Sequence, residues 1–402
     1  MKKLLLLGGS RFLFPVIQEA HKLGLYVITA DYLPDNDAHK KSDEYINVSI
    51  IDKDAVLAVS KELKIDGVMS FACDPGVVTA SYVAEKMGLP FQCSYKTACI
   101  LQNKARFRAF LAEKGFNCPI AKEYDDVVAA LHDSDQFTWP VIVKPVDSAG
   151  SKGVTKVEKK ECLEKAVRLA FDNSITKKII IEDFLDVVGY QSSTDMFTVD
   201  GKVDMPLFSD QVFDPAATNP YVPTVELWPA TMPTNHQTDL VNQLNKLFGL
   251  LGCKNGLYNI ECRVCSNGKT YLMEVSPRGG GNHIALIQDL AYGINYIENE
   301  IRNVVGMPLN LKKASDIDGH WCTYSLHPNK GQQGTFNSVN FRDDFERINL
   351  KYVDLALKPG AVVKPFTGAN MSLGDVLLRF DTREELFDAV LEPSKWIDIK
   401  ID

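Results

Sequence analysis

The sequence lacks the features that mark membrane proteins, exported proteins and nucleic-acid-binding proteins. No stretch approaches the roughly 18 consecutive apolar residues that a membrane-spanning helix needs. The opening segment MKKLLLLGGS has four leucines before its two glycines, which is too short for the core of a signal peptide. No block rich in lysine or arginine stands out and the net charge is −8, so a nucleic-acid partner or an anionic membrane surface is disfavoured. We therefore expect a cytoplasmic protein that binds neither.

The cysteines lack the pattern of a disulfide framework. Nine are scattered along the chain, and an odd number without a signal peptide indicates reduced thiols. Cys262 and Cys265 form a C-x-x-C pair, but residues an odd number apart in a regular strand point to opposite faces. We expect no shared metal ion at this pair.

Two common nucleotide-binding motifs are missing as well. A glycine turn at residues 8–9 and the acidic Asp31 resemble parts of dinucleotide-binding folds, but the G-x-G-x-x-G motif is absent. The G-x-x-x-x-G-K-[ST] motif of P-loop proteins is also absent. A nicotinamide site is therefore disfavoured, and the N-terminal region is interpreted as a structural α/β domain.

What remains is the pattern of a globular α/β protein with several parts. The 402 residues exceed one small core, and the apolar (45%) and charged (24%) fractions are ordinary. Apolar runs at 4–7, 25–30 and 66–71 alternate with helical segments, which predicts a parallel sheet. One long helix is expected over 283–304. We expect a parallel α/β unit at the N-terminus and a mixed appendage over the last hundred residues.

The strongest argument from single residues concerns the segment NIECRVCSNGKTYLMEVS. Its Asn267-Gly268 pair is the preferred dipeptide for a two-residue type I′ turn, which would fix the register of a hairpin. In that register, the residue numbers of any two residues that face each other across the hairpin add up to 535. Glu261 and Glu274 meet this condition and should face each other. Their β-carbons would lie roughly 5 Å apart on one face. The opposite face is expected to be a core face, with Ile260, Cys262, Val264, Tyr271, Met273 and Val275.

Two facing carboxylates need a proton or a cation between them. Like charges directly opposite each other destabilise a sheet, so the pair is typical of a shared ligand. Oxygen-only ligands favour hard ions, which indicates Mg²⁺ or Mn²⁺. The alternative is a pair of solvated glutamates on an exposed face, partly neutralised by Arg263.

A lysine and a loop of small residues suggest where phosphates would bind. Lys144 ends the apolar strand VIVK, and the loop that follows contains Ser148, Gly150, Ser151 and Gly153. Backbone N–H groups of such a loop can surround phosphate oxygens while a lysine supplies positive charge. Taken alone, the segment could equally be a flexible surface hairpin.

A second apolar strand could hold the base of a nucleotide. The run IIIEDFL, residues 179–185, has backbone groups at its end that could hydrogen-bond an adenine edge. Gln191 follows closely and could contact a ribose. Such runs are also ordinary core strands.

The order of these pieces resembles the ATP-grasp superfamily. Lys104 before a helix, the strand V-I-V-K-P, the Gly/Ser loop, E-D-F-L, the paired glutamates and P-R-G-G-G-N follow one another over residues 1 to about 306. The resemblance is strongest to the branch that contains carbamoyl-phosphate synthase large subunits, biotin carboxylases, phosphoribosylglycinamide synthetases and L-amino-acid ligases. It implies a pre-ATP-grasp α/β domain at 1–95, a two-lobed α+β ATP-grasp domain at 96–306 with lobes at about 96–178 and 179–306, and a C-terminal α/β subdomain at 307–402. It also implies ATP and Mg²⁺ as cofactors.

The resemblance assigns a role to each matching residue. Lys104 and Lys144 would contact ATP phosphates, and the loop from Ser148 to Gly153 would close over them. Arg278 would steady an acyl phosphate. The adenine-binding linker would be Glu182, Asp183, Phe184 and Leu185, and the magnesium ligands Glu261 and Glu274.

Three positions depart from the pattern or stay open. The usual ribose-binding glutamate is Gln191 here, and the usual metal-binding asparagine is Ser276. We hypothesise that Asn259, which faces Ser276 in the 535 register, or Asn282 supplies the missing amide oxygen. His283 at a helix start could orient or deprotonate an amine, or simply pack.

These features predict an ATP-dependent carboxylate–amine ligase that works through an acyl phosphate. The alternatives are a carboxylase-like enzyme that phosphorylates bicarbonate or another acid, and a nucleotide-binding module without turnover. The Pro- and Thr-rich segment 209–235 and the tail from 307 are expected to line the side of the small-molecule carboxylate and amine substrates. A homodimer is possible.

Overall fold

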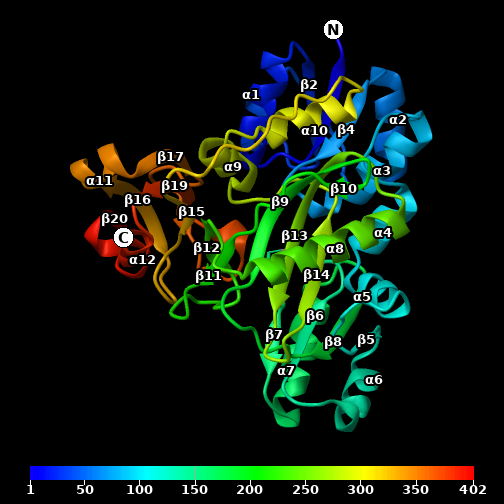
Figure 1. The fold of residues 1–402 in the computed structure, drawn as a ribbon, viewed down its shortest axis with the longest axis vertical. Coiled ribbons are helices and arrows are strands. Elements are labelled where there is room, and N and C mark those ends of the chain that lie inside the picture. The colour runs from blue at the N-terminus through cyan, green and yellow to red at the C-terminus, as the bar shows by residue number, and fades with distance from the viewer. Residues whose placement is uncertain (149) are drawn as a thin grey trace.

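The N-terminal part is a parallel sheet covered by helices, as the sequence predicts. The structure is a computed structural model, and it describes residues 1–148 and 150–402. The sheet has the strand order β3-β2-β1-β4, with every neighbouring pair parallel. It lies at the top of Figure 1. Its elements are β1 (Lys3–Leu7), α1 (Phe14–Lys22), β2 (Tyr26–Asp31), β3 (Glu44–Asn47), α2 (Lys53–Leu63), β4 (Gly67–Ser70) and α3 (Asp74–Met87).

A small lobe at the lower end of the molecule follows a pair of helices (Figure 1). Its sheet has the order β5-β8-β6-β7. The elements are α4 (Tyr95–Leu101), α5 (Lys104–Glu113), β5 (Ala121–Tyr124), α6 (Val127–His132), β6 (Val141–Pro145), β7 (Thr155–Val157), α7 (Leu163–Asp172) and β8 (Ile179–Asp183). The expected lobe division at residue 178 is wrong, because it separates β8 from β5 and β6, the strands to which it is hydrogen-bonded. We propose a division after residue 183.

The central sheet carries the segment that contains the opposed glutamates. Its order is β10-β9-β13-β14, and α8 packs against one face. The elements are β9 (Ser192–Val199), β10 (Lys202–Val203), α8 (Thr234–Leu251), β13 (Gly256–Val264), β14 (Thr270–Ser276), α9 (Ile284–Tyr292) and α10 (Tyr296–Val304).

The single helix expected over 283–304 is wrong. Gly293 has φ 70° and ends α9 in the left-handed region, where glycine carries little strain. Asn295 then caps a new helix, since its side chain accepts the N–H of Glu298 at 2.8 Å. The second helix, α10, packs into the same core as α1 and β1, which joins the central sheet to the N-terminal part.

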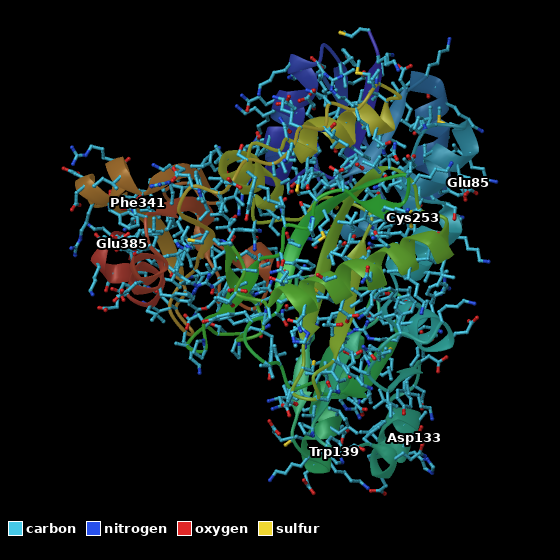
Figure 2. The ribbon with its side chains drawn as sticks, viewed as in Figure 1. Glu85, Asp133, Trp139, Cys253, Phe341 and Glu385 are labelled. Atoms are coloured by element: carbon cyan, nitrogen blue, oxygen red, sulfur yellow. The ribbon has the colours of Figure 1, made fainter. Side chains whose placement is uncertain are left out.

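The C-terminal part forms the left-hand side of Figure 1. Its main sheet has the order β11-β12-β15-β19-β17, and a smaller one the order β18-β16-β20. Figure 2 shows Phe341 and Glu385 on this part, and Asp133 and Trp139 at the end of the small lobe. The elements are β11 (Asp210–Phe213), β12 (Pro223–Trp228), β15 (His320–Leu326), β16 (Gly334–Phe341), α11 (Asp343–Ile348), β17 (Leu350–Leu355), β18 (Val362–Val363), β19 (Gly374–Phe380), α12 (Arg383–Leu391) and β20 (Ile397–Ile401).

The main C-terminal sheet is not built from the tail alone. Its strands β11 and β12 come from the 209–235 segment, and β12 pairs with β15. The expected appendage at 307–402 is therefore completed by a piece of the preceding domain. Across the described residues, we find no helix with the length and apolar character needed to cross a membrane.

Glu300 on α10 should make stability depend on pH. Its side chain is buried and accepts the N–H of Leu257 at 2.8 Å, and burial raises its pKa to about 8. The folded state thus keeps a proton that the unfolded chain loses, so the free energy of unfolding should fall as pH rises from about 4.5 to about 8. The total change is at most roughly 5 kcal/mol.

Glu300→Gln tests this prediction because glutamine keeps the acceptor oxygen and cannot ionise. Denaturant unfolding between about pH 5 and 9 should lose this slope in the variant, and the variant should be more stable than wild type above pH 8. Exposed Glu62 on α2 supplies the control Glu62→Gln, which should leave the slope unchanged. Equal slopes in wild type and Glu300→Gln would contradict the prediction.

Candidate active site

The hairpin of β13 and β14 places Glu261 opposite Glu274, as predicted, although its turn differs. Cys265 donates its N–H to the carbonyl of Lys269 at 2.9 Å, which leaves three residues in the turn, with Gly268 at φ 74°. The predicted two-residue turn is therefore wrong. The longer turn shifts the register by one position, and a bulge in β14 shifts it back before Glu274.

The bulge lies at Met273 and changes which side chains share a face. Tyr271 and Met273, expected on the core face, instead pack with Cys265 and Leu185 in a separate apolar cluster. The prediction is wrong for these two residues because one extra residue reverses the alternation of side chains. The core beneath α8 holds Ile260, Cys262, Val264, Leu272 and Val275. The two cysteines of the C-x-x-C thus lie in different clusters, as predicted.

The paired carboxylates are electrostatically strained. Burial and the charge of Glu274 raise the pKa of Glu261 to about 7. Lys104 Nζ lies 3.3 Å from Glu274 Oε2 and offsets part of the charge. Among the described residues, no group of three His, Cys, Asp or Glu side chains could hold a metal ion. Two carboxylates completed by phosphate oxygens and water suit Mg²⁺, so the residues present fit that ion.

Ser276 and Asn259 face each other at the end of the hairpin. The hydroxyl of Ser276 donates to Asp74 Oδ1 at 2.9 Å. Asn259 donates its Nδ2 to Asp195 Oδ1 at 3.0 Å, which leaves its amide oxygen as the atom available to a cation. Asn282 instead lies close to the buried carboxylate of Glu226. The geometry favours Asn259 over Asn282 as the third metal ligand.

Replacing Asn259 by alanine should therefore raise the Mg²⁺ concentration needed for half-maximal ADP formation. Loss of one neutral oxygen ligand should shift the midpoint by roughly tenfold, as for other changes around a metal site. Asn282→Ala is the matched control and should leave the titration unchanged. An unaltered Mg²⁺ midpoint in Asn259→Ala would exclude this ligand.

A buried charge cluster lies at the expected phosphate site. Glu182 accepts from Arg108 Nε at 2.9 Å and also pairs with Lys144. Burial alone would raise the pKa of Glu182, but these two cations lower it to about 2. Burial lowers the pKa of Lys144 to about 8, with Arg108 adding to the effect. Two cations and one anion leave a net positive charge that an incoming phosphate would balance.

The Gly/Ser loop contacts both sides of this site. Lys104 donates to the carbonyl of Ser148 at 3.1 Å, and Ser151 donates its hydroxyl to the carbonyl of Tyr221 at 2.8 Å. Gly150 and Gly153 have φ of 67° and 72°, which suits glycine. Ala149 of the same predicted loop lies outside the described residues.

Arg278 is held by a carboxylate from the N-terminal part. Its Nε and Nη2 donate to the two oxygens of Asp74 at 2.9 and 2.8 Å, a bidentate pair. Its Nη1 donates to the carbonyl of Gly279 at 3.0 Å. The next residue, Gly280, donates its N–H to both oxygens of buried Asp195. Two carboxylates that the sequence did not indicate therefore fix the P-R-G-G-G segment.

The chain is similar in sequence and in fold to several known proteins. Residues 119–296 match the family described as D-ala D-ala ligase C-terminus. A formate-dependent phosphoribosylglycinamide formyltransferase of Synechococcus sp. (strain WH7803) is 25% identical over 317 residues, which cover 78% of this chain and 79% of that protein. The L-amino acid ligase from Bacillus licheniformis has a TM-score of 0.82 at 21% identity, covering 100% of this chain and 99% of that one. For phosphoribosylglycinamide synthetase from Anaerococcus prevotii the TM-score is 0.77 at 18% identity, with 100% of both chains covered.

The chain is therefore similar to ATP-grasp proteins, in sequence over residues 119–296 and in fold over its whole length. The resemblance drawn from the order of the motifs is confirmed, as is the fold class.

The linker at the end of β8 is the expected adenine site of an ATP-grasp protein. The side chain of Glu182 is occupied by its ion pairs, so only its backbone is available to a base. Asp183 and Phe184 donate their N–H groups to the carbonyls of Ile120 and Pro140. Leu185 packs beside Cys265, Tyr271 and Met273. We name these four side chains the apolar floor.

Two further predicted residues have partners outside the ATP-grasp motifs. Gln191 donates its side-chain amide to Gln211 on β11, which holds it at the edge of the C-terminal sheet. His283 is buried, and its Nε2 lies 2.8 Å from Asp354 Oδ2. Arg11 also pairs with Asp354, so this contact favours a positioning role for His283 over proton transfer.

Proposed function

We propose that this protein is an ATP-dependent carboxylate–amine ligase that forms an acyl phosphate and releases ADP and phosphate. The observation that carries the proposal is the opposed pair of Glu261 and Glu274 with Lys104 3.3 Å from Glu274. A metal–phosphate site needs that combination of carboxylates and a cation, whereas a structural sheet would be destabilised by it. The chain's similarity to ATP-grasp ligases supports the same reaction class.

ATP would lie along the face of the β13–β14 hairpin. In this proposal, the apolar floor takes the adenine, and Lys104 and Lys144 contact the phosphates. Glu261, Glu274 and Asn259 would hold Mg²⁺, which when bound offsets negative charge on the phosphates. The loop from Ser148 to Gly153 would exclude water, a role supported by its contacts to Lys104 and Tyr221.

The reaction would proceed in two steps, phosphorylation of the carboxylate and then formation of the amide. A carboxylate oxygen of the first substrate attacks the γ-phosphorus, the bond to the β-phosphate oxygen breaks, and ADP leaves. The amine nitrogen of the second substrate then attacks the acyl carbon, loses a proton, and displaces phosphate. Arg278 would steady the acyl phosphate with the N–H groups that its bidentate pair with Asp74 leaves free.

The proposed substrates are a small-molecule carboxylate and a small-molecule amine. The β11–β12 segment and the C-terminal sheet are proposed to form the side that receives the carboxylate and the amine. A homodimer and a cytoplasmic location are also predictions.

Measurement of ADP release tests the proposed function. The protein is incubated with ATP, Mg²⁺ and a panel of amino acids and small acids, alone and in pairs. Stimulation by a carboxylate–amine pair, with one new amide per ADP, supports a ligase. Stimulation by bicarbonate alone would instead indicate a carboxylase, and nucleotide binding without any stimulated release would indicate a module without turnover.

A further inference from the structure

Arg263 on β13 is a guanidinium without a protein partner. The side chain is partly buried, its Nε is buried without a hydrogen-bond acceptor, and no side-chain hydrogen bond or ion pair among the described residues includes it. Other arginines near buried carboxylates are paired with them, for example Arg11 with Asp354 and Asp375, Arg108 with Glu182, and Arg278 with Asp74. A guanidinium that is partly removed from water and has no acceptor carries an unbalanced charge, so Arg263 indicates that an anion binds here.

The position of Arg263 along the hairpin identifies the anion. Arg263 faces Tyr271, one step beyond the facing pair Glu261 and Glu274 on the side of the apolar floor. Residues i and i+2 of a strand point to the same face and are about 7 Å apart. Arg263 therefore lies between the proposed metal site and the proposed adenine site. In a nucleotide bound along this face, the ribose and the α-phosphate would lie between the adenine site and the metal site.

The carboxylate pair does not satisfy Arg263. No side-chain nitrogen of Arg263 comes within 4.0 Å of a carboxylate oxygen in the part of the chain that the structure describes. Lys104 is the cation that contacts the pair, through Glu274. A ribose hydroxyl is neutral and would leave the charge unbalanced, whereas a phosphate oxygen accepts charge-assisted hydrogen bonds from a guanidinium.

We propose that Arg263 binds the α-phosphate of the nucleotide. This rests on the proposed nucleotide site and adds a third phosphate contact to those of Lys104 and Lys144, at the end of the phosphate chain next to the ribose. Arg263 thereby distinguishes a nucleotide from a nucleoside before any metal ion is bound.

Binding of adenosine and AMP without divalent cations tests the proposal by calorimetry. Wild type should prefer AMP to adenosine, and Arg263→Met should lose roughly 10- to 100-fold in AMP affinity with little change for adenosine. Arg263→Lys should keep part of the preference. Lys269→Met, in the exposed turn of the same hairpin, is the matched control and should bind both ligands as wild type does.

The thermal stability of the same variants shows that a loss of binding is not a loss of folding. Arg263→Met should melt no lower than wild type without ligand, because a partly buried, unpaired charge has been removed, and AMP should raise its Tm less than that of wild type. An unchanged AMP-to-adenosine ratio, or an equal loss for both ligands, would overturn the role of Arg263. Failure of wild type to bind either ligand would instead overturn the proposed nucleotide site.

Discussion

Glu274→Gln should reduce ADP formation by roughly 10³-fold or more while leaving the protein folded. The glutamine keeps the shape of the side chain but removes one of the two negative charges that would hold Mg²⁺ against the phosphates. It also removes the repulsion between two carboxylates that face each other across the hairpin, so the free energy of unfolding should stay the same or rise slightly. The measurements are initial rates of ADP release at saturating ATP and Mg²⁺, and denaturant unfolding.

Glu384→Gln, on an exposed face of α12, is the control and should retain wild-type activity and stability. Substantial ADP release by Glu274→Gln at ordinary Mg²⁺ concentrations would show that the pair does not hold the ion. A collapse in stability would show that Glu274 supports the fold, for example through its contact with Lys104.

The central feature of the site could be predicted from the sequence because it depends on alternation within one hairpin. The prediction of Glu261 opposite Glu274 was correct, although two details behind it were not. The turn has one residue more than expected, and the bulge at Met273 compensates for it. A bulge depends on how β14 packs against α8 and α4, which no local pattern reveals. Because the bulge was not predicted, Tyr271 and Met273 were expected on the wrong face of the hairpin.

The residues that the sequence did not reveal are partners from distant segments. Asp74 lies 204 positions from Arg278, and Asp195 lies 85 positions from Gly280, so neither pairing leaves a signal in the local sequence. Arg108 is different. It follows Lys104 by four positions, which places both on one face of α5, so helical periodicity could have identified it.

Domain limits were harder to predict than motifs. The sequence correctly indicates β8 as a β-rich segment but not β11 and β12, which lie in the Pro- and Thr-rich segment, and the partners of all three strands decide the part of the molecule to which they belong. Strand β8 pairs with strands that precede it, and β12 pairs with β15 about a hundred residues later. Propensity predicts that a strand exists, whereas pairing is fixed by long-range packing.

Asp74→Ala should lower both stability and activity, because it leaves Arg278 buried without its counterion. Asp74 accepts two hydrogen bonds from Arg278 and one from Ser276, and so ties the start of α3 to the end of β14. Burial opposes ionisation of Asp74, but Arg278 lowers its pKa, so the pair is ionised at neutral pH. Breaking one side of a buried pair typically costs roughly 3–5 kcal/mol. Chemical denaturation measures this loss.

A double-mutant cycle separates the ion pair from other effects of the substitution. Asp74→Ala combined with Arg278→Ala removes both charges, so the double variant should be more stable than the sum of the two single losses implies. Additive losses would show that the two side chains do not act as a pair. In kinetics, Asp74→Ala should lower kcat by roughly 10²-fold and change the KM for ATP little, since Lys104 and Lys144 rather than Arg278 would contact the nucleotide. A rise in the KM for ATP with an unchanged kcat would instead place Arg278 on the nucleotide and remove it from the acyl phosphate.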